Sequence, residues 1–188
     1  MASWNKIAKR IRVPMGFAFA VLYLWLARPS LAFMAASLLL VIPGLLLRGY
    51  ASGYVKKNKE LTTTGPYAYT RNPLYLGSMM MAFGLAAASL RWEIVVLLAI
   101  LFVIIYLPTI LSEEKYLQEH FTEFAAYAKR VPRLLPRLTP GTSNDSTGGG
   151  AGSFSAALYR KHREYNAGVG ACAVYAALIA LLVWRGLK

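Results

Sequence analysis

The chain has 188 residues, of which 57% are hydrophobic, and its mean hydropathy is +0.44. Its 21 Lys and Arg residues outnumber its 8 Asp and Glu residues, which gives a formal charge of +13. The apolar residues lie in runs long enough to cross a bilayer, and this leaves no separate basic domain that could bind nucleic acid.

The apolar runs predict an all-α integral membrane bundle of about five transmembrane helices. In chain order they cover about 13–27, 31–47, 74–90, 94–111 and 167–184. Pro43 and Gly44 predict a kink within the second run. No small-residue cleavage site follows the first run, so we expect a retained helix rather than a signal peptide.

The segments between and after these runs predict the domain organisation. Residues 139–153 are rich in Gly, Ser and Thr, as in a flexible linker. Residues 154–165 are basic and aromatic, which suits a membrane surface. We therefore expect a core at 1–138, a linker at 139–153, and an interfacial helix with the fifth span at 154–188.

The distribution of Lys and Arg predicts the topology. Four precede the first predicted span, 5 lie between the second and third, and 8 lie between the fourth and fifth. The opposite side has only Arg28, Arg91, Arg185 and Lys188. Because the richer side faces the cytoplasm, we expect the N-terminus and both long loops there, and the C-terminus outside. The outer turns are short, so chemistry is expected in segments 48–73 and 112–137.

Segment 65–77 concentrates unusual residues where the chain enters the third predicted span. Pro73 suits the first turn of a helix, and Asn72 before it is a natural N-cap. Arg71 then lies at the positive end of the helix, which attracts anions. Gly77 permits a close approach of a backbone or a ligand. The alternative is a belt of interfacial Tyr and Arg anchors.

Two adjacent carboxylates, Glu113 and Glu114, follow the fourth predicted span. Acidic groups at a helix C-terminus oppose its dipole, so membrane anchoring does not explain them. Neighbouring helical residues point about 100° apart, so one can face the interior while the other meets solvent or Lys115. The alternative is a solvated helix face that continues to Glu119 and Glu123.

A third segment, 127–137, contains Tyr127 and two prolines that end a helix and return the chain to the membrane surface. Its alternative is a basic interfacial tether. No metal site is predicted, because His120 and His162 lie far apart without Cys or Asp at ligand spacing. The lone Cys172 excludes an internal disulfide. No phosphate-binding glycine loop, dinucleotide fingerprint or nucleophile elbow is present.

In this order, the three segments resemble the isoprenylcysteine carboxyl methyltransferase family and its phospholipid methyltransferase relatives. The matching blocks are Gly65-Pro66-Tyr67…Arg71-Asn72-Pro73-Leu74-Tyr75-Leu76-Gly77, then Glu113-Glu114…Leu117…Phe121, then Tyr127…Arg130-Val131-Pro132…Leu135-Pro136. The resemblance covers about residues 48–137. The sequence departs from the family at Asn72, where His is more usual, so acid–base work is not expected there. Residues 107–110 lack the Arg that eukaryotic prenylcysteine enzymes carry, and those enzymes stop soon after the third block.

The resemblance implies a helical membrane enzyme that binds S-adenosylmethionine in a cytoplasmic pocket and admits a hydrophobic acceptor from the lipid. Arg71 and Glu114 are the expected catalytic residues. The expected cofactor-binding residues are Gly65, Tyr67, Arg71, Asn72, Pro73, Tyr75, Gly77, Glu113, Glu114 and Tyr127. Arg71 can hold the cofactor carboxylate, and the glutamates can accept from its hydroxyls or ammonium. Tyr67, Tyr69 or Tyr75 can face the sulfonium.

The implied function is methyl transfer from S-adenosylmethionine to a lipophilic acceptor, such as an isoprenylcysteine carboxylate or a related thiol, at the cytoplasmic membrane face. The expected partners are the lipid bilayer and this acceptor, with no nucleic acid. N-methylation of an aminophospholipid, a non-catalytic membrane scaffold and a sterol-type reductase with a nicotinamide cofactor are the alternatives. A reductase would need a site for the phosphates of a second nucleotide, and the sequence offers only scattered cations.

Overall fold

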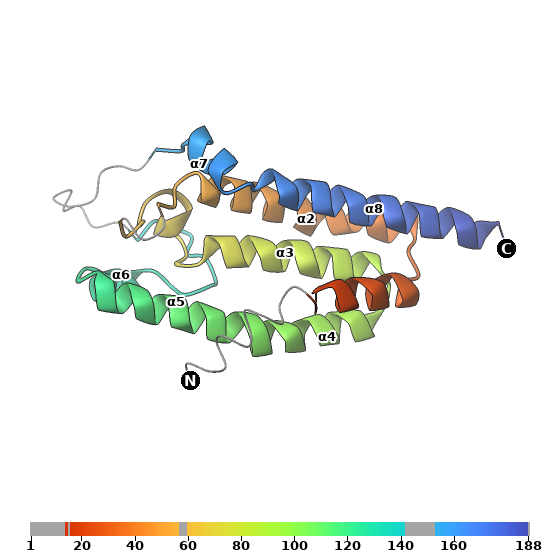
Figure 1. Cartoon of the computed structure of the whole chain (residues 1–188), viewed down its shortest axis with the longest axis horizontal. Coiled ribbons are helices and arrows are strands. Elements are labelled where there is room, and N and C mark those ends of the chain that lie inside the picture. The colour runs from red at the N-terminus through yellow and green to blue at the C-terminus, as the bar shows by residue number, and fades with distance from the viewer. Residues whose placement is uncertain (1–13, 15, 57–59, 142–152, 188) are drawn as a thin grey trace. The chain divides into compact units, whose positions relative to one another are not determined.

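The computed structural model describes residues 14, 16–56, 60–141 and 153–187, and no described residue belongs to a strand (Figure 1). An N-terminal helix, Gly16–Leu26, precedes the others. The remaining elements are α2 (Leu31–Ser52), the 3₁₀ turn η1 (Gly65–Ala68), α3 (Pro73–Ala88), α4 (Trp92–Leu101), the π-helical turn η2 (Phe102–Tyr106), α5 (Leu107–His120), α6 (Phe124–Arg130), α7 (Ala156–Lys161) and α8 (Tyr165–Gly186).

Three described helices are long and apolar enough to cross a membrane: Leu31–Ser52, Trp92–His120 and Tyr165–Gly186. The all-helical membrane prediction is confirmed at this level. The first and third predicted spans correspond to the shorter apolar helices Gly16–Leu26 and Pro73–Ala88. At about 1.5 Å per residue, neither matches a hydrocarbon core of about 30 Å, so a count of five spans stays a prediction.

The fourth predicted span continues beyond residue 111 and carries Glu113 and Glu114 within one helical stretch, Trp92–His120. The helix widens into the π turn Phe102–Tyr106 just before Pro108. Proline lacks the N–H that an α-helix would direct to the carbonyl of Ile104, and helices accommodate such a gap by local rewinding. Both carboxylates are therefore presented by a helix rather than by a loop.

The chain divides into two compact units. Unit 1 comprises Met1–Ile42, Met80–Ser112 and Val169–Lys188, and unit 2 comprises Pro43–Met79 and Glu113–Gly168. This division groups segments from distant parts of the sequence. The predicted partition into core, linker and C-terminal part stays a prediction, and residues 142–152 of the predicted linker lie outside the described residues.

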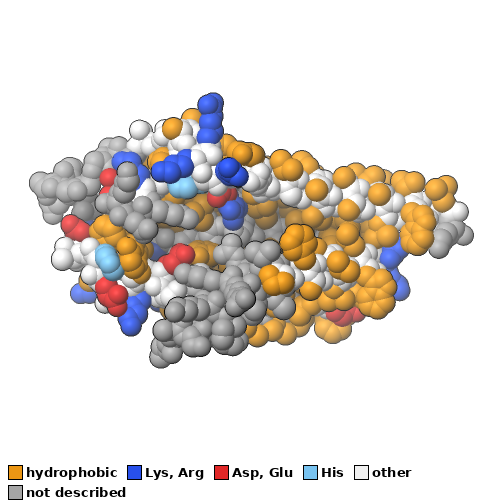
Figure 2. Space-filling model, viewed as in Figure 1, with side chains coloured by type: hydrophobic (Ala, Val, Ile, Leu, Met, Phe, Trp, Pro, Cys, Tyr) orange, Lys and Arg blue, Asp and Glu red, His pale blue; other side chains and the backbone are white. Residues whose placement is uncertain are grey.

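Unit 1 has an apolar core with side chains from five helices: Gly16–Leu26, α2, α3, α4 and α8. The buried members are Tyr23, Ala27, Met34, Ala86, Ala88, Ile94 and Leu178. The Tyr23 hydroxyl donates to the Leu85 carbonyl at 2.7 Å, and the hydroxyls of Ser37 and Tyr175 lie 2.5 Å apart. Outside this core the surface is apolar, as the visible side of α8 illustrates (Figure 2). Such a surface suits a lipid environment.

Unit 2 has a small core around α6, formed by Phe124, Tyr127 and Val131 with half-buried apolar neighbours. After α6 the chain returns alongside the loop that precedes α3, and three backbone hydrogen bonds join the two. They run from Arg71 N–H to the Pro132 carbonyl, from Arg137 N–H to the Tyr69 carbonyl, and from Gly141 N–H to the Ala68 carbonyl, at 2.8–3.0 Å. The first and third sequence blocks therefore lie side by side.

Candidate active site

Glu114 is the residue on which the three sequence blocks converge. Its side chain is 8% exposed. The Asn72 amide donates to Oε1 at 3.1 Å, the Arg133 Nε donates to Oε2 at 2.9 Å, and the Arg71 Nε lies 3.6 Å from Oε1. A buried carboxylate is costly unless it is paired and hydrogen-bonded. Two guanidinium groups and one amide meet that need here.

Glu113, the adjacent carboxylate, is exposed and accepts a hydrogen bond from the Tyr75 hydroxyl at 3.0 Å. The two glutamates thus face different surroundings, as the 100° spacing of helical neighbours predicts. Since a carboxylate offers about four acceptor positions, Glu113 retains capacity for a ligand.

Arg71 combines burial with an unused donor. Its side chain is 12% exposed, and its Nε is buried without a hydrogen-bond acceptor among the described residues. The guanidinium carbon lies 5.9 Å from the centre of the Phe124 ring, within reach of a cation–π contact. A buried N–H without an acceptor costs free energy, so an anion that reached this guanidinium would be stabilised.

Asn72 lies directly before α3 and links this helix to Glu114. Its carbonyl accepts the first helical hydrogen bond of α3, from Leu76 N–H at 3.0 Å, as an N-cap residue does. Its side-chain amide N–H groups donate to Glu114 and to the Arg133 carbonyl, so the ionised acceptor Glu114 holds this side chain at the start of α3. Capping by the amide oxygen of Asn72 stays a prediction.

Tyr67 and Tyr127 are two buried phenols near this cluster. The Tyr127 hydroxyl donates to the Tyr67 carbonyl at 2.7 Å. Burial raises the pKa of Tyr67, and the nearby Tyr127, Glu113 and Glu164 raise it further. Burial also raises the pKa of Tyr127, which Arg71 lowers and Glu114 raises to smaller extents. Both phenols therefore stay protonated and can donate at neutral pH.

The remaining predicted site residues have local structural reasons for their positions. Pro73 is buried as the first residue of α3, as predicted. Gly65 has a φ of +59°, and a Cβ there would lie 2.6 Å from the Tyr54 ring, so only glycine fits. At Gly77 a Cβ would lie 2.7 Å from the Gly44 carbonyl oxygen in α2. Gly77 thus permits a close approach of backbone.

Residues 33–123 match the phospholipid methyltransferase family. The matched segment covers just under half of the chain. It contains the first two sequence blocks with Arg71, Asn72 and Glu114, and it ends just before α6. The family resemblance drawn from the sequence is therefore confirmed, and the match indicates a membrane methyltransferase.

Two curated relatives align with about half of the chain. Cobalt-zinc-cadmium resistance protein CzcN of Cupriavidus metallidurans is 39% identical over 90 residues, which are 48% of this chain and 41% of that protein. Nickel-cobalt-cadmium resistance protein NccN of Alcaligenes xylosoxydans xylosoxydans is 40% identical over the same shares. The alignments span about two fifths of each relative. No solved structure matches the chain.

The names of both relatives concern resistance to metals. In the part of the chain that the structure describes, no group of three or more His, Cys, Asp or Glu side chains is placed to hold a metal ion. The described side chains of the candidate site are carboxylates, guanidinium groups and phenols.

Sequence reasoning missed two contributors to the site. Arg133 was assigned only to a basic tether, although it binds Glu114 and is half exposed. Arg48 pairs with Glu164 at 2.8 Å and also donates to the Ser78 hydroxyl. Both partners are largely buried, and Glu164 comes from beyond the matched segment. The one available signal was that Glu164 is an isolated acid directly after the basic residues 160–163.

Proposed function

We propose that the chain is an S-adenosylmethionine-dependent methyltransferase that acts on a lipophilic acceptor at the cytoplasmic face of a membrane. The observation that carries this proposal is the buried, unused Nε donor of Arg71 beside Glu114, within the phospholipid methyltransferase segment. Such a donor next to an organised carboxylate suits a zwitterionic ligand, which presents an anion and a cation a few bonds apart.

The residues present fit this cofactor. Arg71 would bind its amino-acid carboxylate through the donor that lacks an acceptor. Glu113, exposed beside Tyr75, would accept from the cofactor's ammonium or ribose hydroxyls. Glu114 positions Arg71 and Asn72 through the contacts that already saturate much of its carboxylate. Tyr67 and Tyr127 would shield the site from water, since both are buried.

When bound, the cofactor supplies an electrophilic methyl group on a sulfonium. The protein's part is then to align the acceptor and exclude water, which accounts for large accelerations without covalent help from the enzyme. The buried network around Glu114 supports this reading because it holds Arg71 in one orientation before any ligand arrives.

The first acceptor class is a carboxylate or thiolate attached to a lipid, such as an isoprenylcysteine. Such a group is already ionised or easily ionised, so it needs no general base. This agrees with Asn72, which cannot titrate, at the position where the family more often has His.

An aminophospholipid is the second candidate. The description of the matched family favours it. An ammonium must lose a proton before it can attack, so this reaction needs a base. Glu113 is the candidate base, because it is exposed and accepts a hydrogen bond from the neutral Tyr75 hydroxyl.

Calorimetry on full-length protein in detergent tests the cofactor site. We expect S-adenosylmethionine and its demethylated product to bind wild type, and Arg71→Gln to weaken binding at least about tenfold, the loss expected for one charged hydrogen bond. Arg130→Gln removes an exposed charge from α6 and serves as the matched control. Equal affinity in wild type and a folded Arg71→Gln variant would refute the assignment, and absence of binding to wild type would favour the scaffold alternative.

Transfer of a labelled methyl group to a panel of acceptors then distinguishes the two candidates. The panel contains a prenylated cysteine, a lipid thiol, and phosphatidylethanolamine in micelles. If the prenylated cysteine or the lipid thiol is labelled and phosphatidylethanolamine is not, the carboxylate and thiol class is supported. Labelling of phosphatidylethanolamine, with loss of activity in Glu113→Gln, supports the amine class.

A further inference from the structure

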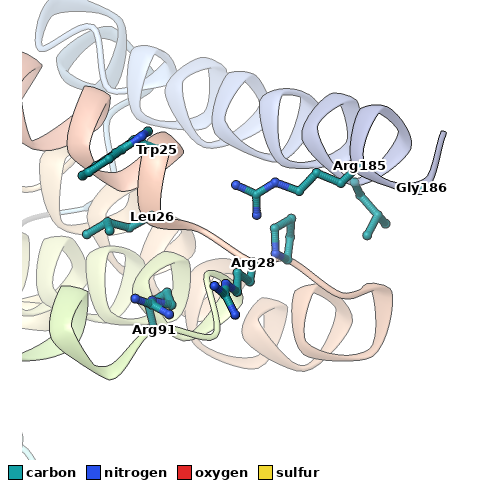
Figure 3. Close-up of a pocket in the computed structure, with 8 residues that line it drawn as sticks. Trp25, Leu26, Arg28, Arg91, Arg185 and Gly186 are labelled. Atoms are coloured by element: carbon teal, nitrogen blue, oxygen red, sulfur yellow. The ribbon is translucent and has the colours of Figure 1, made fainter. Parts of the chain in front are cut away.

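A pocket of about 700 Å³ opens in unit 1, and none of its lining residues is assigned to the proposed active site. Arg28, Arg91 and Arg185 line it, together with the apolar side chains of Trp25, Leu26 and Leu182 (Figure 3). The arginines come from the turn after Gly16–Leu26, the turn before α4, and the end of α8. Three segments distant in sequence therefore bring guanidinium groups to one opening.

The charges in this pocket are not balanced by the described residues around it. Arg91 pairs with Glu93 at 3.1 Å, which compensates one of the three guanidinium groups. Arg185 donates to the Ala27 carbonyl, a neutral acceptor. Within the described residues, the exposed Arg28 side chain has no hydrogen bond or ion pair. The Arg91 Nε is buried without an acceptor. Neighbouring like charges repel each other, so this arrangement favours an anionic ligand.

The surroundings of the pocket indicate a membrane interface. Three exposed tryptophans lie near the pocket arginines in the sequence: Trp25, Trp92 and Trp184, exposed by 74%, 72% and 55%. The second and third are directly adjacent to Arg91 and Arg185. Exposed Trp is enriched at the level of the lipid head groups. Phosphate and guanidinium meet at this depth, and a guanidinium can bind phosphate oxygens with two parallel hydrogen bonds.

We propose that this pocket binds the phosphate of an anionic phospholipid, with the acyl chains against the exposed apolar surface of unit 1. A lipid is favoured over free phosphate because half of the lining is apolar and because Trp25 is exposed beside the arginines. By the predicted topology, the lipid belongs to the outer leaflet. This inference does not depend on the proposed methyl transfer.

Native mass spectrometry of full-length, delipidated protein tests this site. Phosphatidylglycerol, diacylglycerol and inorganic phosphate are titrated separately, and bound molecules are counted. The test variant combines Arg28→Gln, Arg91→Gln and Arg185→Gln. The control combines Lys129→Gln, Arg130→Gln and Arg160→Gln, which removes the same charge from exposed side chains in unit 2.

We expect wild type and control to bind one phosphatidylglycerol with the same affinity, and the test variant to bind it at least about tenfold more weakly. Equal affinity in all three proteins, or equal loss in both variants, would overturn the proposal. Binding of diacylglycerol as tight as that of phosphatidylglycerol would overturn the role of phosphate. Displacement of the lipid by equimolar inorganic phosphate would overturn the lipid as its source.

The single variant Arg28→Gln tests the pocket even if the triple variant does not fold. Because the Arg28 side chain has no hydrogen bond or ion pair with the described residues, this change should leave the melting temperature within about 2 °C of wild type. We expect affinity for phosphatidylglycerol to fall roughly threefold. A folded Arg28→Gln variant with wild-type affinity would count against the pocket.

Discussion

The Arg71 Nε lies 3.6 Å from the Glu114 Oε1, and both side chains are about nine-tenths buried. This pair joins the loop before α3 to α5. Arg133 binds the other oxygen of the same carboxylate. Removal of the shared carboxylate would leave two guanidinium groups close together, one of them buried.

Glu114→Gln should therefore destabilise the protein by about 3 kcal/mol, the usual cost of breaking a buried ion pair. Glu113→Gln, one position away, should change stability by less than about 0.5 kcal/mol, because Glu113 is exposed. Denaturant unfolding in detergent, followed by Trp fluorescence, measures both. Equal losses in the two variants would mean that the environments of the glutamates are not as different as described.

Asn72→Ala should cost about 2 kcal/mol, because the amide donates to both Glu114 and the Arg133 carbonyl and the acceptors would be left buried. Asn72→His restores the more usual family residue. We expect it to recover part of that stability and to make cofactor binding depend on pH near 6–7, the range in which His titrates. A binding affinity of Asn72→His that stays flat from pH 5.5 to 8 would contradict this.

The parts of this site that sequence alone could predict are the local ones. Helical spacing predicted that Glu113 and Glu114 would diverge, and proline chemistry predicted the start of α3 at Pro73. The end of α3 was missed. The apolar run continues to Leu90, yet the chain leaves the helix after Ala88, with Leu90 at a φ of 55°. Composition carries no signal for such a left-handed turn at a non-glycine residue.

Long-range pairings were beyond the sequence for a different reason. The pairing of Arg48 with Glu164 depends on the rotation of α2 about its axis and on the path of the turn before α8, and hydropathy fixes neither. Likewise, nothing local distinguishes Arg133 from the neighbouring basic residues of segment 127–137. Only the path of the chain, held by the hydrogen bond from Arg71 N–H to the Pro132 carbonyl, brings Arg133 to Glu114.

Gly77→Ala tests close packing against cofactor contact. A Cβ at this position would meet the Gly44 carbonyl oxygen and the Arg48 side chain at 2.7 Å, so we expect a loss of about 1–3 kcal/mol. Gly170→Ala in α8 is the control, since its Cβ would meet open space. This change should raise the free energy of unfolding by about 0.5–1 kcal/mol. Stability loss in Gly77→Ala with wild-type cofactor affinity would show that Gly77 acts through packing alone.

A double-mutant cycle on Arg48 and Glu164 tests whether the start of α8 is anchored to α2. The Arg48 Nε and Nη2 both donate to one oxygen of Glu164, at 3.1 and 2.8 Å. Arg48→Met and Glu164→Gln should each destabilise the protein, and the double variant should lose less than the sum, with a coupling of about 1–3 kcal/mol. Additive losses would mean that the pair does not form in solution.

The loss of stability at alkaline pH should depend on Tyr67 and Tyr127. Their pKa values are raised above the ordinary 10.0, chiefly by burial. Below pH 10 both the folded and the unfolded chain keep these protons, so their contribution to stability is complete. Above it the unfolded chain ionises while the folded chain does not, and the free energy of unfolding falls by up to about 1.4 kcal/mol per pH unit for each phenol. In the combined Tyr67→Phe and Tyr127→Phe variant, the free energy of unfolding should fall less steeply between pH 10 and 11. Unfolding followed by Trp fluorescence measures this.

The free energy of unfolding of this variant will be lower at the outset, because Tyr127→Phe removes a hydrogen bond to the Tyr67 carbonyl worth about 1 kcal/mol. Tyr165→Phe removes a half-exposed phenol and controls for ring substitution alone. An unchanged slope in the double variant would mean that these two phenols are not shielded from water in the folded protein.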